Sequence, residues 1–157
     1  MVHLVRITNT DYRDYRRSYA KIEYSFRTKD EPEFVIPEGE KKEFMDAAIL
    51  KKGEFLDELE KPGVEMYFIK NDAEEIVGIT TFKAEGKRCM IGMFAVFPKG
   101  EGIGSEALKL LKELLKSKGV NIVRLVCPFK GARVFWEKQG FYHVRNTDST
   151  YETWFPK

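Results

Sequence analysis

The chain of 157 residues has little cysteine, no excess of one charge and no long apolar run, and each shortage excludes a class of protein. The two cysteines, Cys89 and Cys127, lie far apart and form no metal-ligand pattern, so we expect reduced core thiols and no metal. The 27 basic and 25 acidic residues leave a net charge of +2, which argues against a large basic surface for nucleic acid. No apolar run approaches the roughly 20 residues that cross a bilayer, and the N-terminus lacks a signal-peptide segment. These patterns predict a cytoplasmic protein that binds neither membrane nor nucleic acid.

The composition that is present, 43% hydrophobic and 13% aromatic, is typical of a packed globular fold. Apolar alternation predicts strands at residues 3–8, 64–70, 75–84, 88–97, 121–127, 141–144 and 151–155. Helical spacing predicts helices at residues 10–21, 40–59, 105–118 and 131–139, with Gly53 breaking or bending the second. The strand–helix–strand step from residue 90 to residue 127 implies one parallel pair in an otherwise antiparallel sheet. We therefore expect one α/β (α+β) domain over residues 1–157, with a mixed, mostly antiparallel central sheet and helices on both faces.

The most informative segment is the glycine-rich stretch Val96–Ser105, which lies between a predicted strand and a predicted helix. The first amides of a helix have no partner within the helix. Glycine lets a bulky anion approach those amides closely, and the helix dipole adds roughly half a positive charge there. This segment therefore predicts a phosphate or pyrophosphate site.

Three phosphate-binding patterns compete for this segment. A P-loop requires Lys and then Ser or Thr after its last glycine, but Ser105 and Glu106 follow Gly104. A dinucleotide fingerprint requires a different glycine spacing and an acidic residue roughly 20 positions later. In this chain residues 122–125, which lie at that distance, include no acidic residue. The third pattern, the acyl-coenzyme A loop Gln/Arg-x-x-Gly-x-Gly/Ala, is matched by Lys99-x-x-Gly102-x-Gly104 with lysine in the first place.

A second motif supports the third pattern. The segment Ala132–Phe141 is similar to the sequence A-x-x-x-Y-x-x-x-G-F, with a predicted strand between it and the glycine loop. With both motifs in this order, the chain resembles the GNAT superfamily of N-acetyltransferases. The resemblance covers roughly residues 65–141, and the order of elements extends it to the whole chain.

The resemblance implies where acetyl-coenzyme A would bind as cosubstrate. Backbone groups of the strand before the loop would pair with the pantetheine arm, and the loop amides would hold the pyrophosphate, with the side chain of Glu101 pointing outward. Arg133 would attract phosphate, while Phe129 and Trp136 stand at family positions beside the coenzyme. The implied coenzyme-binding residues are Phe94, Ala95, Val96, Lys99, Gly100, Glu101, Gly102, Ile103, Gly104, Ser105, Phe129, Arg133 and Trp136.

The resemblance also implies a chemistry, from which the chain departs at two positions. The family carries Asn where this chain has Phe129, and Tyr, its general acid, where this chain has Trp136. An indole N–H donates hydrogen bonds but has no usable acid pKa, so we expect Trp136 to pack against the coenzyme or the core. A backbone N–H at Ala95 or Val96 would stabilise the oxyanion, and Val96 is our choice for this catalytic donor.

The proton acceptor is open at this stage because residues 89–96 carry no carboxylate. Glu23, Asp46, Tyr142 or a water chain could take the proton, although each side chain is also explained by solvation or packing. His3, His143 and Cys127 are more simply explained as structural residues than as catalytic ones.

The acceptor and the oligomeric state are not fixed by the sequence. Residues 23–39 form a predicted long loop that either shapes the acceptor site or is a surface loop. We expect a small-molecule or peptide amine as acceptor, a monomer or homodimer, and direct attack without an acyl-enzyme. The alternatives are a coenzyme-binding protein with the same fold and weak or lost catalysis, and a nucleotide-phosphate module.

Overall fold

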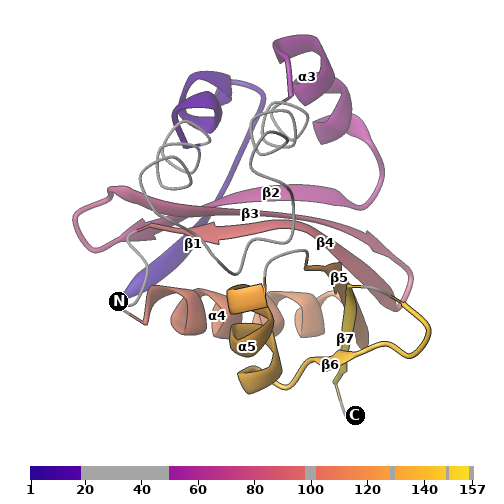
Figure 1. Cartoon of the computed structure of the whole chain (residues 1–157). Coiled ribbons are helices and arrows are strands. Elements are labelled where there is room, and N and C mark those ends of the chain that lie inside the picture. Colours follow the sequence, from indigo (N-terminus) through magenta and orange to yellow (C-terminus); the bar gives the residue numbers. More distant parts are fainter. Residues whose placement is uncertain (19–49, 98–101, 128–129, 148, 156–157) are drawn as a thin grey trace, which may run out of the picture.

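A computed structural model describes residues 1–18, 50–97, 102–127, 130–147 and 149–155 (Figure 1). Its strands form one seven-stranded sheet in the order β1-β2-β3-β4-β5-β7-β6. Only β4 and β5 pair in parallel, and the other neighbours pair antiparallel, as predicted. The strands are β1 Val2–Arg6, β2 Val64–Asn71, β3 Ile76–Glu85, β4 Arg88–Val96, β5 Ile122–Val126, β6 Tyr142–His143 and β7 Thr150–Trp154.

Helices cover both faces of the sheet, which confirms the predicted fold class (Figure 1). On one face lie the helical residues 12–18 and α3, Lys52–Glu60. On the other face lie α4, Ile103–Ser117, and α5, Lys130–Lys138. No helix in the described ranges is long and apolar enough to cross a membrane.

Each face of the sheet has its own core. Tyr15 and Phe55 pack on Met66 and Phe68 of β2 on the α3 face. On the α4 face, a helical stripe of four side chains is buried against the sheet: Ala107, Leu108, Leu111 and Leu115. Burying a side chain of leucine size contributes about 1.5–3 kcal/mol, so this stripe anchors α4 along the sheet. Gly119, with a φ of 83°, follows the end of the helix.

The predicted helix over residues 40–59 is wrong at Leu50 and Lys51, which are not helical. The backbone of Leu50 is instead hydrogen-bonded to two tyrosines. Its carbonyl accepts from Tyr12 Oη at 2.9 Å, and its amide donates to Tyr15 Oη at 3.2 Å. The Lys51 amide then donates to Glu54 Oε1 at 3.1 Å and caps α3. Gly53 therefore sits inside the first turn of α3 and does not break it.

Other boundaries differ by only a few residues. The last two predicted strands become the two-residue β6 and the five-residue β7. The predicted loop 23–39 and the candidate proton acceptors Glu23 and Asp46 lie outside the described residues.

Candidate functional site

The two parallel strands separate where β5 ends. β4 pairs with β5 only from Arg88 to Ile91, whereas it pairs with β3 as far as Val96. The edge of β4 from Gly92 to Val96 therefore has no partner in β5. An unpaired strand edge offers backbone donors and acceptors to an extended ligand.

The alternation of an antiparallel ladder indicates which amides face this open edge. The Phe97 amide donates to the Val77 carbonyl at 2.8 Å, so it faces β3. Residues two apart point the same way, so the backbone of Ala95 also faces β3. Phe94 and Val96 then present their backbone groups to the open edge, which favours them over Ala95 as donors to a ligand.

The N-terminus of α4 lies beside Val96. Gly102 is its N-cap, with a φ of 76°, and its carbonyl accepts from the Glu106 amide at 3.2 Å. The amides of residues 103–105 precede the first hydrogen bond of the helix and have no acceptor within it. A Cβ on Gly104 would lie 3.2 Å from Phe135 Cε1 and 3.7 Å from Val96 Cγ2, so this glycine lets α4 approach both α5 and β4.

An aromatic cluster joins α5 to β4 next to the same edge. Trp136 is 6% exposed, and its ring centroid lies 5.3 Å from that of Phe94, 5.1 Å from Phe135 and 5.0 Å from Phe141. These edge-to-face contacts are worth about 0.5–1.5 kcal/mol each beyond burial. The packing role predicted for Trp136 is thus favoured.

Further contacts tie α5 to α4 and to the end of β5. Gln139 Nε2 donates to Ser105 Oγ at 3.0 Å, and Arg133 Nε donates to the Cys127 carbonyl at 3.2 Å. Cys127 is buried, and its amide donates to the Ser149 carbonyl at 2.9 Å. The structure thus brings Phe94, Val96 and the residues 102–105 to one place, while Arg133 of α5 is bonded to Cys127, the residue that follows β5.

Several predicted residues lie elsewhere or outside the described chain. Lys99, Gly100, Glu101 and Phe129 are not described. His3 Nε2 lies 3.0 Å from Glu74 Oε1 at the far edge of the sheet, and His143 packs on the ring of Tyr151. Tyr142 Oη donates to Glu152 Oε1 at 2.9 Å and accepts from Trp154 Nε1 at 2.6 Å. No group of three potential metal ligands occurs in the described ranges.

Two buried carboxylates were not singled out from the sequence, Glu65 on β2 and Glu152 on β7. Burial raises the pKa of Glu65, but hydrogen bonds from Lys118 and Tyr67 and the charge of Arg6 outweigh it and hold the pKa below its ordinary value. Hydrogen bonds from Tyr142 and Arg124 likewise outweigh the effect of burial on the pKa of Glu152. Glu65 lies at the C-terminal end of α4, away from the open edge, and both groups are poor proton acceptors because their pKa values are lowered. Glu65 could have been found from the sequence, because it is a glutamate within the otherwise apolar run 64–69.

Comparison with known proteins gives one family. The model of the acetyltransferase (GNAT) family matches residues 12–141. No curated protein matches the chain.

Solved structures with the same fold have low sequence identity to this chain. The PaiA N-acetyltransferase of Thermoplasma acidophilum, in complex with coenzyme A, is 16% identical with a TM-score of 0.74, over 99% of each chain. An acetyltransferase of Thermus thermophilus is 17% identical with a TM-score of 0.72, over 99% of this chain and 97% of the other. The ribosomal-protein-S18-alanine N-acetyltransferase of Escherichia coli is 13% identical with a TM-score of 0.64, over 97% and 91%. At these sequence identities the similarity shows a shared fold and nothing more.

Proposed function

Because the chain belongs to the acetyltransferase (GNAT) family, we propose that it transfers an acetyl group from acetyl-coenzyme A to a primary amine by direct attack. The observation that carries the proposal is the open edge of β4 beside the N-terminus of α4. Acetyl-coenzyme A has a pantetheine arm rich in amide groups and, next to it, a pyrophosphate. The strand edge can pair with the arm, and the helix N-terminus can bind the pyrophosphate.

The chain's own groups divide the binding between them. Phe94 and Val96 would hydrogen-bond the pantetheine arm as a neighbouring strand does. The amides of Gly102, Ile103, Gly104 and Ser105, with those of Lys99, Gly100 and Glu101, would hold the pyrophosphate. Arg133 would add positive charge beside it. Phe129 and Trp136 complete the proposed set, with Trp136 holding Phe94 in place through its ring contact.

Acetyl-coenzyme A supplies the activated acyl group, and the protein positions the amine against it. In our proposal the Val96 amide donates to the oxygen that becomes negatively charged, and one such donor is typically worth ~3 kcal/mol. Direct attack is favoured over an acyl-enzyme because the Cys127 thiol is buried in the core.

Binding and catalysis are tested separately. Calorimetry with acetyl-coenzyme A measures binding, and thiol release across a panel of small amines and peptides measures transfer. We expect saturable binding and thiol release that depends on the amine. Absence of binding would exclude the proposed function.

A second candidate function is coenzyme binding with weak or no transfer. The observation in its favour is the burial of Trp136 in an aromatic cluster at the position of the family's general acid. Tight binding of acetyl-coenzyme A without thiol release for any amine would favour this second function.

The substitution Trp136→Phe is expected to change the rate of thiol release by less than about threefold. Phenylalanine retains an aromatic contact to Phe94 and Phe141, and the indole takes no part in proton transfer. Steady-state thiol release checks the rate, and urea unfolding of the same variant checks stability. A loss of about 100-fold in rate with unchanged stability would give Trp136 a direct role in the chemistry.

A further inference from the structure

One part of the sheet is exposed to solvent on the α3 face. Among the described residues six large apolar side chains are exposed, and four of these lie here: Met90 at 44%, Val126 at 59%, Tyr142 at 49% and Trp154 at 55%. We call the surface formed by these four residues with Arg88 and Arg124 the open face. An exposed apolar patch that combines aromatic and charged side chains is typical of a binding surface.

The strand register places these residues in two rows across β4, β5 and β7. Arg88 is opposite Ile122, which is opposite Trp154. Two residues further along β4, Met90 is opposite Arg124, and the row continues through Glu152 to Tyr142. Residues two apart on a strand share a face, so both rows belong to one surface.

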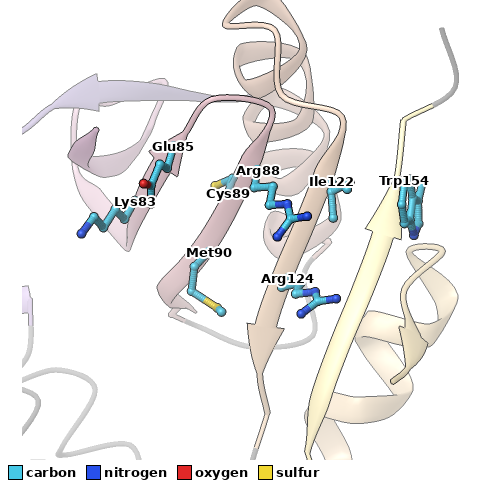
Figure 2. A pocket seen from close by; sticks show the side chains of 8 residues that line it. All are labelled: Lys83, Glu85, Arg88, Cys89, Met90, Ile122, Arg124 and Trp154. Carbon is cyan, nitrogen blue, oxygen red and sulfur yellow. The ribbon is translucent and has the colours of Figure 1, made fainter. Parts of the chain in front are cut away.

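Residues of both rows, with Lys83 and Glu85 of β3, line a hollow of 340 Å³. Figure 2 shows the side chains that line it. Arg88, Met90, Ile122, Arg124 and Trp154 line it from three strands. Figure 2 shows the two arginines over β5 and Trp154 at the β7 side, whereas Lys83 extends away from both arginines.

Hydrogen bonds fix the orientation of one side of the hollow. Trp154 Nε1 donates to Tyr142 Oη, which donates to Glu152 Oε1, and Arg124 Nε donates to Glu152 Oε2. Glu152 is 4% exposed, so a buried carboxylate anchors two exposed aromatic rings and one guanidinium. A surface held in one arrangement loses less entropy when a ligand binds.

The hollow carries a net positive charge. Three cations, Lys83, Arg88 and Arg124, and one carboxylate, Glu85, line the hollow, and Arg124 is paired with the buried Glu152. Glu85 is opposite Arg88 in the β3–β4 register, yet within the described ranges Arg88 forms no ion pair. A second copy on the same surface would bring like charges together, so an anionic ligand is the better complement.

The open face is continuous with the open edge of β4. Val126 is the last residue of β5, and the pairing of β4 with β5 stops one residue earlier, at Ile91 and Leu125. From Arg88 to Val96, the proposed oxyanion donor, the strand advances eight residues. At about 3.3 Å per residue this spans about 26 Å.

From these contacts we infer that the open face binds the body of the acceptor, which is an elongated amine with an anionic group at its far end. The amine lies at the open edge of β4 beside Val96, an apolar segment lies along Met90, and the anionic group lies at Arg88, in the row that Ile122 and Trp154 continue. This inference rests on the proposed function.

The test uses protein saturated with coenzyme A and a series of ω-amino carboxylic acids of increasing chain length, each compared with its terminal amide by calorimetry. The acid whose amine and carboxylate are about 26 Å apart is expected to bind about fivefold more tightly than its amide. Shorter acids are expected to show no such preference. The substitution Arg88→Met is expected to remove the preference.

Lys87→Met is the matched control, because it removes the same charge from the neighbouring residue, which does not line the hollow. It is expected to retain the fivefold preference. If no acid in the series binds more tightly than its amide, or if Arg88→Met retains the preference, the inference is overturned. It is also overturned if sedimentation shows a dimer that Trp154→Asp dissociates.

Failure of this inference is distinguishable from failure of the proposed function. Binding of acetyl-coenzyme A with thiol release from a short amine, alongside no preference for acids, overturns the open-face inference alone. Absence of acetyl-coenzyme A binding overturns the proposed function and this inference with it.

Discussion

The substitution Gly102→Val is expected to weaken the binding of acetyl-coenzyme A by about 100-fold, or about 2.7 kcal/mol. Gly102 is the N-cap of α4 and has a φ of 76°, a conformation that a β-branched residue adopts only with strain. No atom lies within 4 Å of a Cβ at this position, so the effect comes from the backbone and not from a clash. The strained cap would turn the first amides of α4 away from the proposed pyrophosphate site. Calorimetric titration with acetyl-coenzyme A measures the change.

Gly119→Val is the matched control at the other end of the same helix. Gly119 has a φ of 83° and also has no atom within 4 Å of a Cβ, so valine meets the same strain there. Both variants are expected to lose a similar 1–3 kcal/mol or so in the free energy of unfolding, but only Gly102→Val is expected to lose coenzyme affinity. Equal affinities for the two variants would contradict the proposed pyrophosphate site.

Gly104→Val gives a less specific result than Gly102→Val, although both glycines belong to the same motif. A Cβ on Gly104 meets Phe135 at 3.2 Å, so valine there would displace an aromatic ring that packs on Trp136. A change in coenzyme affinity would then have two causes. The sequence predicted both glycines as loop residues, and the structure distinguishes the one that sets the backbone from the one that lets two helices approach.

Local patterns predicted most of the fold because each element has its own periodicity. The apolar alternation of β2 and β3 and the leucine stripe of α4 predicted their positions to within a few residues. The glycine loop and the motif at Ala132–Phe141 predicted the family that the comparisons show. These signals lie in consecutive residues, so the sequence alone contains them.

Contacts between distant residues account for what the sequence did not predict. The backbone of Leu50, which is not helical, is hydrogen-bonded to the hydroxyls of Tyr12 and Tyr15, more than 30 positions away. The point where β4 and β5 separate depends on the pairing of two strands that are joined by α4 in the sequence, and no local pattern predicts it. The two buried carboxylates were not predicted because the cations that stabilise them come from other elements of the fold.

Glu65 is the second residue whose substitution is expected to have a large effect, here on stability. Its side chain is 9% exposed, and its carboxylate lies 3.1 Å from Arg6 Nη1 and 2.7 Å from Lys118 Nζ. It also accepts from Tyr67 Oη at 2.5 Å. One buried carboxylate thereby joins β1, β2 and the C-terminal end of α4.

Glu65→Gln is expected to lower the free energy of unfolding at neutral pH by about 2 kcal/mol. Removing one partner of a buried ion pair commonly costs 3–5 kcal/mol or so. The smaller value is expected because Arg6 and Lys118 are 52% and 32% exposed and can turn toward water. Urea unfolding of the variant and the unmodified protein measures the difference.

The same variant tests the pH dependence of stability. The pKa of Glu65 is below its ordinary value of 4.5 in the folded protein, so the folded state binds this proton less readily than the unfolded state. The stabilisation is therefore complete above the unfolded pKa and is lost as the pH falls through the folded pKa. We expect the 2 kcal/mol or so between the two proteins to vanish under these acidic conditions, because a protonated Glu65 and a glutamine are then both neutral.

Glu152→Gln is the comparison that isolates the role of Glu65. Glu152 is also buried with a lowered pKa, so its loss is expected to remove a separate part of the acid dependence. The two effects should add in the double variant, because the carboxylates share no partner and join different elements. If Glu65→Gln unfolds with the same dependence on acidic pH as the unmodified protein, then the pKa of Glu65 is the same in the folded and unfolded states and its ion pairs add no net stability. In that case the connection between β1, β2 and α4 rests on apolar packing alone.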